Sequence, residues 1–130
     1  MKINHDCLKG MLEAFEAAEK PTTDIRELKS RGYSHEEDKF IFHLRILYDK
    51  GFVESEAGSG VGADIAADGS VMWSVIPLRL TAQGHDFSEA LHNSKVWEVI
   101  KAKFKDASIG TVALAAKLML EAYTKGRIGS

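Results

Sequence analysis

Apolar residues recur at helical spacing near the start of the chain. Four of them fall three or four positions apart: Leu8, Met11, Leu12 and Phe15. This spacing predicts an amphipathic helix over about residues 4–19, which Pro21 ends. The stretch TTDIRELK predicts a short second helix with Thr22 or Thr23 as its N-cap. Gly32 then suits a tight turn, because glycine lacks a Cβ atom.

The clearest helical pattern lies in the stretch GYSHEEDKFIFHLRILYDKGF. Ser34 and Glu37 match the S-x-x-E capping box, in which each side chain accepts a hydrogen bond from the other residue's backbone amide. An apolar stripe follows, formed by Phe40, Leu44, Leu47 and Tyr48. The pattern therefore predicts a third helix that ends at Gly51, in the position of a glycine C-cap.

Alternating β-branched and aromatic residues follow this helix. FVESE, residues 52–56, predicts a strand, and VMWSVIPLRL, residues 71–80, predicts its antiparallel partner, with Pro77 suited to an edge. The connection AGSGVGADIAADGS is long and rich in glycine and alanine, which is typical of a flexible tip. Three helices followed by such a hairpin indicate a winged helix-turn-helix. The expected fold is mainly α with a small antiparallel β-hairpin, an α+β class.

Three more stretches with periodic apolar residues follow the hairpin, and each begins with Thr or Ser in the manner of an N-cap. They are TAQGHDFSEALHN, SKVWEVIKAKF and SIGTVALAAKLMLEAYTK. The last is apolar well beyond one stripe, so it needs cover from its own domain or from another chain. We expect a single domain over residues 1–130, with a winged-helix core (1–80) and C-terminal helices (81–130) that form a homodimer.

Length and composition agree with one globular domain. The chain has 130 residues, of which 45% are hydrophobic and 28% are charged. Cys7 is the only cysteine, so no internal disulfide can form and a reducing compartment is expected. No apolar run reaches the length of a membrane span, and MKINHDCLKG lacks the features of a secretory signal. We therefore expect a cytoplasmic protein without a membrane partner.

Several short motifs resemble those of one protein family. They are Gly32-Tyr33-Ser34, Phe42-His43-Leu44, Gly51-Phe52-Val53, Arg79-Leu80-Thr81, Gly84-His85-Asp86-Phe87 and Val96-Trp97. In this order, over roughly residues 3–105, they resemble domain-of-unknown-function family 2513, which consists of small proteins of bacteria and their phages. The resemblance implies a winged-helix fold, a bacterial or prophage origin and a DNA-associated regulator. It assigns no catalytic residue.

The first functional hypothesis is binding of double-stranded DNA, which a winged helix reads through its third helix. The residues that would contact DNA are His35, Lys39 and Arg45 on the outward face of that helix, and Arg26, Lys29 and Arg31 near the second helix. Residues 51–78 hold no Lys or Arg, so the predicted wing has no positive charge with which to contact phosphate. A second basic stretch, Lys95, Lys101, Lys103 and Lys105, is more simply explained as a solvated helix face.

The same third helix carries features that oppose DNA binding. Asp38 and Asp49 lie on its outward face, and Glu36 lies near its start, where each would repel phosphate. Phe42 and Ile46, four residues apart, form an apolar pair on that face. The second hypothesis is therefore a non-enzymatic module that docks a protein partner through this pair. In the competing structural explanation, the C-terminal helices fold back over the pair.

Other motifs give little support for catalysis or for a cofactor. GSGVGA, residues 58–63, matches a dinucleotide-binding turn, but no long helix follows it, so we expect a wing tip. His5, Asp6 and Cys7 are consecutive, and consecutive residues rarely converge on one metal. Cys7 is expected to act as a small hydrophobe, and His43 as a packed or hydrogen-bonded structural histidine. We expect no enzyme activity, no metal and no cofactor.

Overall fold

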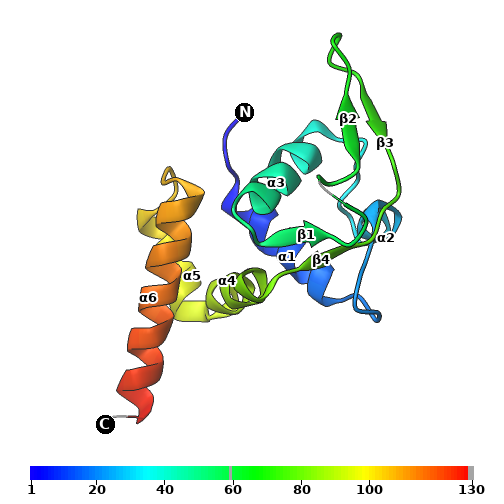
Figure 1. Cartoon of the computed structure of the whole chain (residues 1–130). Helices are drawn as coiled ribbons and strands as arrows, with labels where there is room; N and C mark the ends of the chain where they lie inside the picture. Colours follow the sequence, from blue (N-terminus) through cyan, green and yellow to red (C-terminus); the bar gives the residue numbers. More distant parts are fainter. Residues whose placement is uncertain (59, 129–130) are drawn as a thin grey trace.

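The computed structural model describes residues 1–58 and 60–128 (Figure 1). Within these residues it has six helices and two antiparallel two-stranded sheets, which confirms a mixed α+β protein. The elements are α1 (His5–Glu16), α2 (Ile25–Ser30), α3 (Asp38–Asp49), β1 (Val53–Ser55), β2 (Ala63–Ile65), β3 (Val71–Trp73), β4 (Leu78–Leu80), α4 (Ala82–His92), α5 (Ser94–Lys103) and α6 (Ile109–Ile128). Helix α6 and the β2–β3 hairpin lie at opposite sides of the molecule.

The first two helices form as their apolar spacing predicts, but the N-cap of the second differs from the prediction. Asn4 caps α1 by accepting a hydrogen bond from the Cys7 amide at 3.0 Å. Asp24 caps α2, and the predicted cap at Thr22 or Thr23 is wrong. Thr23 instead exchanges backbone hydrogen bonds with Leu78, both at 2.8 Å, in an isolated antiparallel bridge. Thr23, which the local sequence pattern predicts as a cap, thus pairs with a residue that is distant in the sequence.

Helix α3 has the predicted stripe and the predicted end, but not the capping box. Its N-cap is Glu37, which makes no side-chain capping bond. The Ser34 hydroxyl accepts from the Glu36 amide at 3.2 Å and so closes a local turn before the helix. Gly51 follows the helix with φ +74°, a conformation that L side chains rarely adopt. Gly51 is therefore the helix stop that the sequence predicts.

The strand pairing corrects the predicted hairpin. Strand β1 pairs with β4, with Val53 opposite Leu80, and β2 pairs with β3, with Ala63 opposite Trp73. The stretch 71–80 is thus two strands, and the connection predicted to be flexible contains β2. The described part of GSGVGA leads into β2, which begins at Ala63, and not to the wing tip, since Val61 is only 5% exposed in the core.

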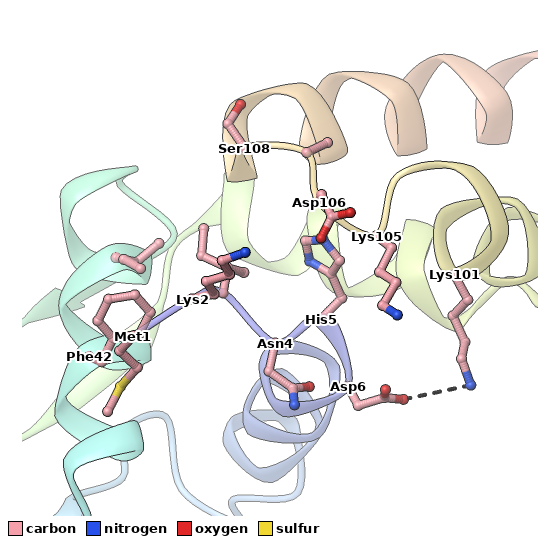
Figure 2. A pocket seen from close by; sticks show the side chains of 13 residues that line it. Met1, Lys2, Asn4, His5, Asp6, Phe42, Lys101, Lys105, Asp106 and Ser108 are labelled. Carbon is pink, nitrogen blue, oxygen red and sulfur yellow. Dashed lines mark ion pairs between the residues drawn. The ribbon is translucent and has the colours of Figure 1, made fainter.

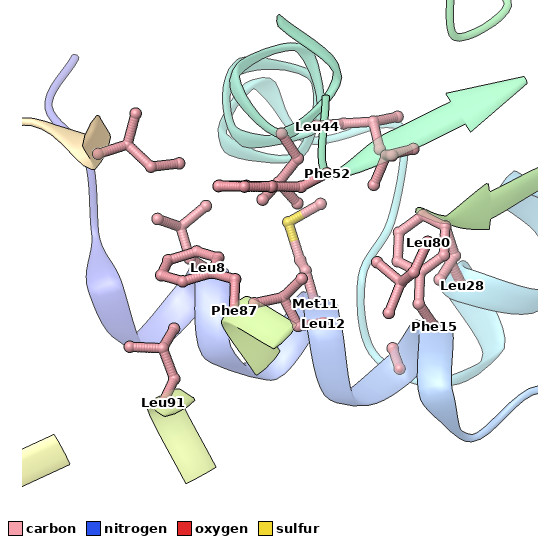
Figure 3. Close-up of a cluster of buried hydrophobic side chains, with 14 of the residues drawn as sticks. Leu8, Met11, Leu12, Phe15, Leu28, Leu44, Phe52, Leu80, Phe87 and Leu91 are labelled. Carbon is pink, nitrogen blue, oxygen red and sulfur yellow. The ribbon is translucent and has the colours of Figure 1, made fainter. Parts of the chain in front are cut away.

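One cluster of buried side chains joins the helices before the sheets to those after them (Figure 3). Leu8, Met11 and Leu12 of α1 are almost fully buried, and α1 contacts α2, β4 and α4. Phe87 of α4 stacks on Phe52, with ring centroids 4.8 Å apart. The C-terminal helices are therefore part of the same core as the first three helices.

Helix α6 receives only part of the cover that its composition requires. Its residues Ile109, Val112 and Ala116 are buried, and the helix contacts α4 and α5. Leu114 and Leu118 are 59% and 54% exposed, one helical turn apart. An apolar outer face thus remains on α6 in the single chain.

Close packing of α4 on the turn before β1 gives a stability prediction. A Cβ atom at Gly84 would collide with the backbone carbonyl of Phe52, whereas one at Gly110 would meet the flexible end of Lys50 at 3.3 Å. We expect Gly84→Ala to lower the free energy of unfolding by about 1–3 kcal/mol. The matched Gly110→Ala should leave it unchanged or raise it slightly, because alanine favours a helix. Urea denaturation checks this, and wild-type stability of Gly84→Ala would contradict the packing.

Candidate functional site

The cations predicted to contact DNA near α2 are all engaged by acidic neighbours. Arg26 pairs with Asp24 at 3.2 Å, and Arg31 pairs with Glu27 at 3.3 Å. Lys29 pairs with Glu36, which precedes α3, and this hydrogen bond lowers the pKa of the Glu36 carboxyl. Arg31 also donates to the Ala17 carbonyl at 3.0 Å, so part of its side chain serves the fold.

The predicted DNA contacts around α3 do not form one outward basic face. Lys39 pairs with Glu37 at 3.4 Å. His35 precedes the helix and is half-buried, with its ring edge-on to Trp73 at 5.6 Å between centroids, so its expected outward position on the helix is wrong. Arg45 is exposed, and none of the ion pairs found among residues 1–58 and 60–128 involves it.

The charge of the whole region explains these pairs. From Asp24 to Leu78, across α2, α3 and both hairpin strands, the chain holds six Lys or Arg and ten Asp or Glu, a net charge of −4. Arg79 of β4 pairs with Glu54 of β1 and with Glu56, which follows β1. A surface that releases counterions from DNA phosphates needs an excess of cations. This region has an excess of carboxylates.

Phe42 and Ile46 face a cleft between α3 and the C-terminal helices (Figure 2). Both are half-buried, and neither is fully covered by those helices. The cleft has a volume of about 970 Å³. It is lined by the N-terminal segment Met1–Asp6, by Phe42 and Ile46, and by Lys101, Lys105, Asp106, Ala107 and Ser108. We call this site the α3 cleft.

His43 holds the N-terminal segment against α3 and so shapes the cleft. Its Nε2 atom accepts the Asn4 backbone N–H at 2.9 Å, which places the ring proton on Nδ1, where it donates to the Lys39 carbonyl at 2.6 Å. The ring is 2% exposed, which confirms the expected structural histidine. Burial lowers the pKa of His43, because the interior disfavours the charged form.

His5 connects the N-terminal segment to the residue that follows α5. Its side chain is 8% exposed, and Nε2 lies 3.1 Å from the carbonyl oxygen of Phe104 after α5. Its Nδ1 atom is buried without a hydrogen-bond partner among the described residues. Asn4 and His5 thus connect α1 both to α3 and to the C-terminal helices.

The sequence predicts the two α3 residues that line the cleft, Phe42 and Ile46, as an apolar surface pair, but it does not predict the cleft itself. Lys2, His5 and Lys105 come from segments that are about 100 residues apart in the chain, and no local pattern relates them. The available signal was the excess of lysine in residues 95–105, which hold four Lys and one Glu. From the sequence alone, this excess is more simply explained as a solvated helix face.

The remaining candidate groups are not assembled into a second site. Burial raises the pKa of the Cys7 thiol, and its side chain packs against the core, as predicted for a small hydrophobe. The described part of the chain contains no group of three or more His, Cys, Asp or Glu side chains that could hold a metal. Gly60 donates to the Tyr48 hydroxyl at 2.8 Å, and a strand follows GSGVGA where a dinucleotide site needs a helix.

Comparison with known proteins gives a family but no function. The family described as Hypothetical protein (DUF2513) matches residues 2–110. This chain belongs to that family. No curated protein and no solved structure matches it. Every residue named above as lining the α3 cleft, except Met1, lies within the matched range. None of the helices in residues 1–58 and 60–128 is both long and apolar enough to cross a bilayer.

The buried, neutral His43 predicts a pH dependence of stability. Its pKa is lower in the folded chain than its ordinary value of about 6.5, so the unfolded chain binds the proton more readily. We expect the free energy of unfolding to fall as the pH falls from about 7 to about 5, by at most about 1.4 kcal/mol per pH unit from this residue. Urea denaturation across this range should show a smaller slope for His43→Leu. An equal slope in both proteins would exclude His43 as the cause.

Proposed function

We propose that this member of the family is a non-enzymatic protein-interaction module built on a winged helix-turn-helix, and that it does not read DNA. Helices α1, α2 and α3 precede the β1–β4 pair along the chain. The β2–β3 hairpin comes between β1 and β4 in the sequence, where a winged helix has its wing (Figure 1). The Thr23–Leu78 bridge occupies the position of a short third strand beside β4. This order of elements supports the scaffold.

The charge balance from Asp24 to Leu78 carries the functional part of the proposal. Non-specific DNA affinity rests on Lys and Arg that displace counterions from the phosphates. Here α2, α3 and the wing together carry a net charge of −4, and four of the five cations predicted to contact DNA are in ion pairs. Such a surface repels the DNA backbone.

The α3 cleft is the docking surface that this proposal assigns. Phe42 and Ile46 offer half-buried apolar area, and five charged side chains share the lining of the same cleft. Interfaces of this kind bury a central apolar anchor within a polar rim. The cleft has both parts before any partner is present.

DNA binding by a regulator is the competing proposal. The order of the helices supports it, as does Arg45, which is exposed on α3. Its contacts would be those named from the sequence, on α3 and near α2. A bacterial or prophage origin and a cytoplasmic location stay predictions of the sequence.

Two substitutions on α3 separate the proposals. We expect Phe42→Asp to abolish capture of a specific partner in pull-downs from a lysate of the source organism, because it places a charge in the apolar wall of the cleft. Arg45→Asp, the matched control on the exposed side of the same helix, should capture the partner normally. Neither variant nor the wild type should bind mixed duplex DNA at low salt in a fluorescence anisotropy titration.

The opposite pattern would support a DNA regulator. In that case the wild type binds duplex DNA, the binding weakens steeply with salt, and Arg45→Asp removes it. Circular dichroism establishes that each variant is folded. If Phe42→Asp unfolds, Lys105→Glu on the far edge of the cleft provides the same test without disturbing α3.

The exposed face of α6 supports a homodimer as part of this proposal. Leu114 and Leu118 would gain cover from the same face of a second copy. We expect sedimentation at micromolar concentration to give the mass of a dimer, and Leu118→Glu to give that of a monomer, because the substitution charges the apolar face. A monomeric wild type would contradict self-association through α6.

A further inference from the structure

The α3 cleft is built from two walls of different chemistry. Figure 2 shows Phe42 and Met1 on one side, and Lys101 and Lys105 on the other. The cationic wall belongs to α5 and the loop after it, where residues 95–105 hold four Lys and one Glu. This local excess contrasts with the net charge of −4 from Asp24 to Leu78. A ligand that is apolar at one end and acidic at the other would complement both walls.

The lining of the cleft also includes a ring with an unpartnered polar atom. The His5 side chain lines the cleft and is more than nine-tenths buried, yet its Nδ1 atom has no hydrogen-bond partner among the described residues. A buried polar atom without a partner costs free energy, so its persistence requires an explanation. A hydrogen-bond donor on a ligand would provide the missing bond only after the ring turned towards the cleft, because the Nδ1 atom itself is enclosed by the protein.

The start of α6 is a third feature of the cleft lining. Ala107 and Ser108 line the cleft immediately before this 20-residue helix. The Ser108 hydroxyl accepts from the Thr111 amide at 3.2 Å and so caps the first turn. The positive end of the helix dipole therefore lies at the lining of the cleft and favours an anion there.

The acidic residues of the cleft limit the class of ligand. Asp6 lies 3.9 Å from Lys101, and Asp106 also lines the cleft, so its five charged side chains carry a net charge of only +1. Nucleic acid, which needs many cations, is a poor match for this charge and for the apolar wall. A volume of about 970 Å³ is at the upper limit for small-molecule pockets and admits several residues of a peptide.

We infer that the α3 cleft binds an acidic peptide segment of a partner protein. One large apolar side chain of the segment packs on Phe42 and Ile46, and its carboxylates meet Lys101, Lys105 and the start of α6. This inference rests on the proposed interaction function and gives the chemistry of the partner. It requires no covalent step.

The fluorescence of Trp97 can report binding at the cationic wall. Its ring lies 5.7 Å from the Lys101 Nζ atom, so a carboxylate that draws Lys101 away changes the environment of the indole. The chain has two tryptophans, and Trp73→Phe leaves Trp97 as the single emitter. This variant can be titrated with blocked hexapeptides of Asp and Glu that carry one Leu or Phe at each position in turn.

We expect at least one peptide of this panel to bind with a dissociation constant of roughly 10–100 µM, as is usual for weak, transient contacts. Replacing its acidic residues by Gln and Asn, or its apolar residue by Ser, should weaken binding at least about tenfold. The double variant Lys101→Glu, Lys105→Glu should do the same in isothermal titration calorimetry, which does not depend on the contact between Lys101 and Trp97. Lys103→Glu, the matched control, should bind normally, because Lys103 is exposed on the same stretch but does not line the cleft.

Three outcomes would overturn the inference. They are no binding by any peptide at about 1 mM, equal loss in Lys103→Glu and in the double variant, and binding of free hexanoate as tight as that of the best peptide. The first outcome, combined with Phe42-dependent capture of a whole protein, leaves the interaction function standing and removes only the acidic-peptide ligand. Salt-sensitive DNA binding that depends on Arg45 removes the interaction function itself.

Discussion

The buried face of α1 is the contact on which the rest of the structure depends. Leu8, Met11 and Leu12 are at most 1% exposed, and the helix contacts α2, β4 and α4. At its start, Asn4 bonds to His43 of α3 while His5 bonds to the carbonyl of Phe104 after α5. One amphipathic helix therefore fixes the distance between α3 and the C-terminal helices. The α3 cleft is the space that remains between them.

Much of the fold follows from the local sequence pattern, and the predictions that are wrong share one physical cause. The spacing of Phe40, Leu44 and Leu47 places α3 correctly, since a helix satisfies its hydrogen bonds within itself. Thr23 was misassigned because its partner, Leu78, is 55 positions away. The split of residues 71–80 into β3 and β4 has the same origin, because strand pairing is decided by residues that are distant in sequence.

The site was predictable only in part for the same reason. Phe42 and Ile46 stand out because a helix that is apolar on two faces needs two neighbours. Their actual neighbours, the N-terminal segment and the loop after α5, meet only through tertiary packing. Charge was more informative than motif. The −4 balance from Asp24 to Leu78 can be counted directly, and the ion pairs of Arg26, Lys29 and Arg31 are its structural expression.

The family match ends at Gly110, within the first turn of α6, but the packing does not end there. Val112 and Ala116 lie beyond that boundary and are fully buried, and α6 covers parts of α4 and α5. Covering those helices requires apolar side chains at helical spacing and little else, so many sequences satisfy it. A chain cut at the end of the family match would therefore lose Val112 and Ala116 from its core.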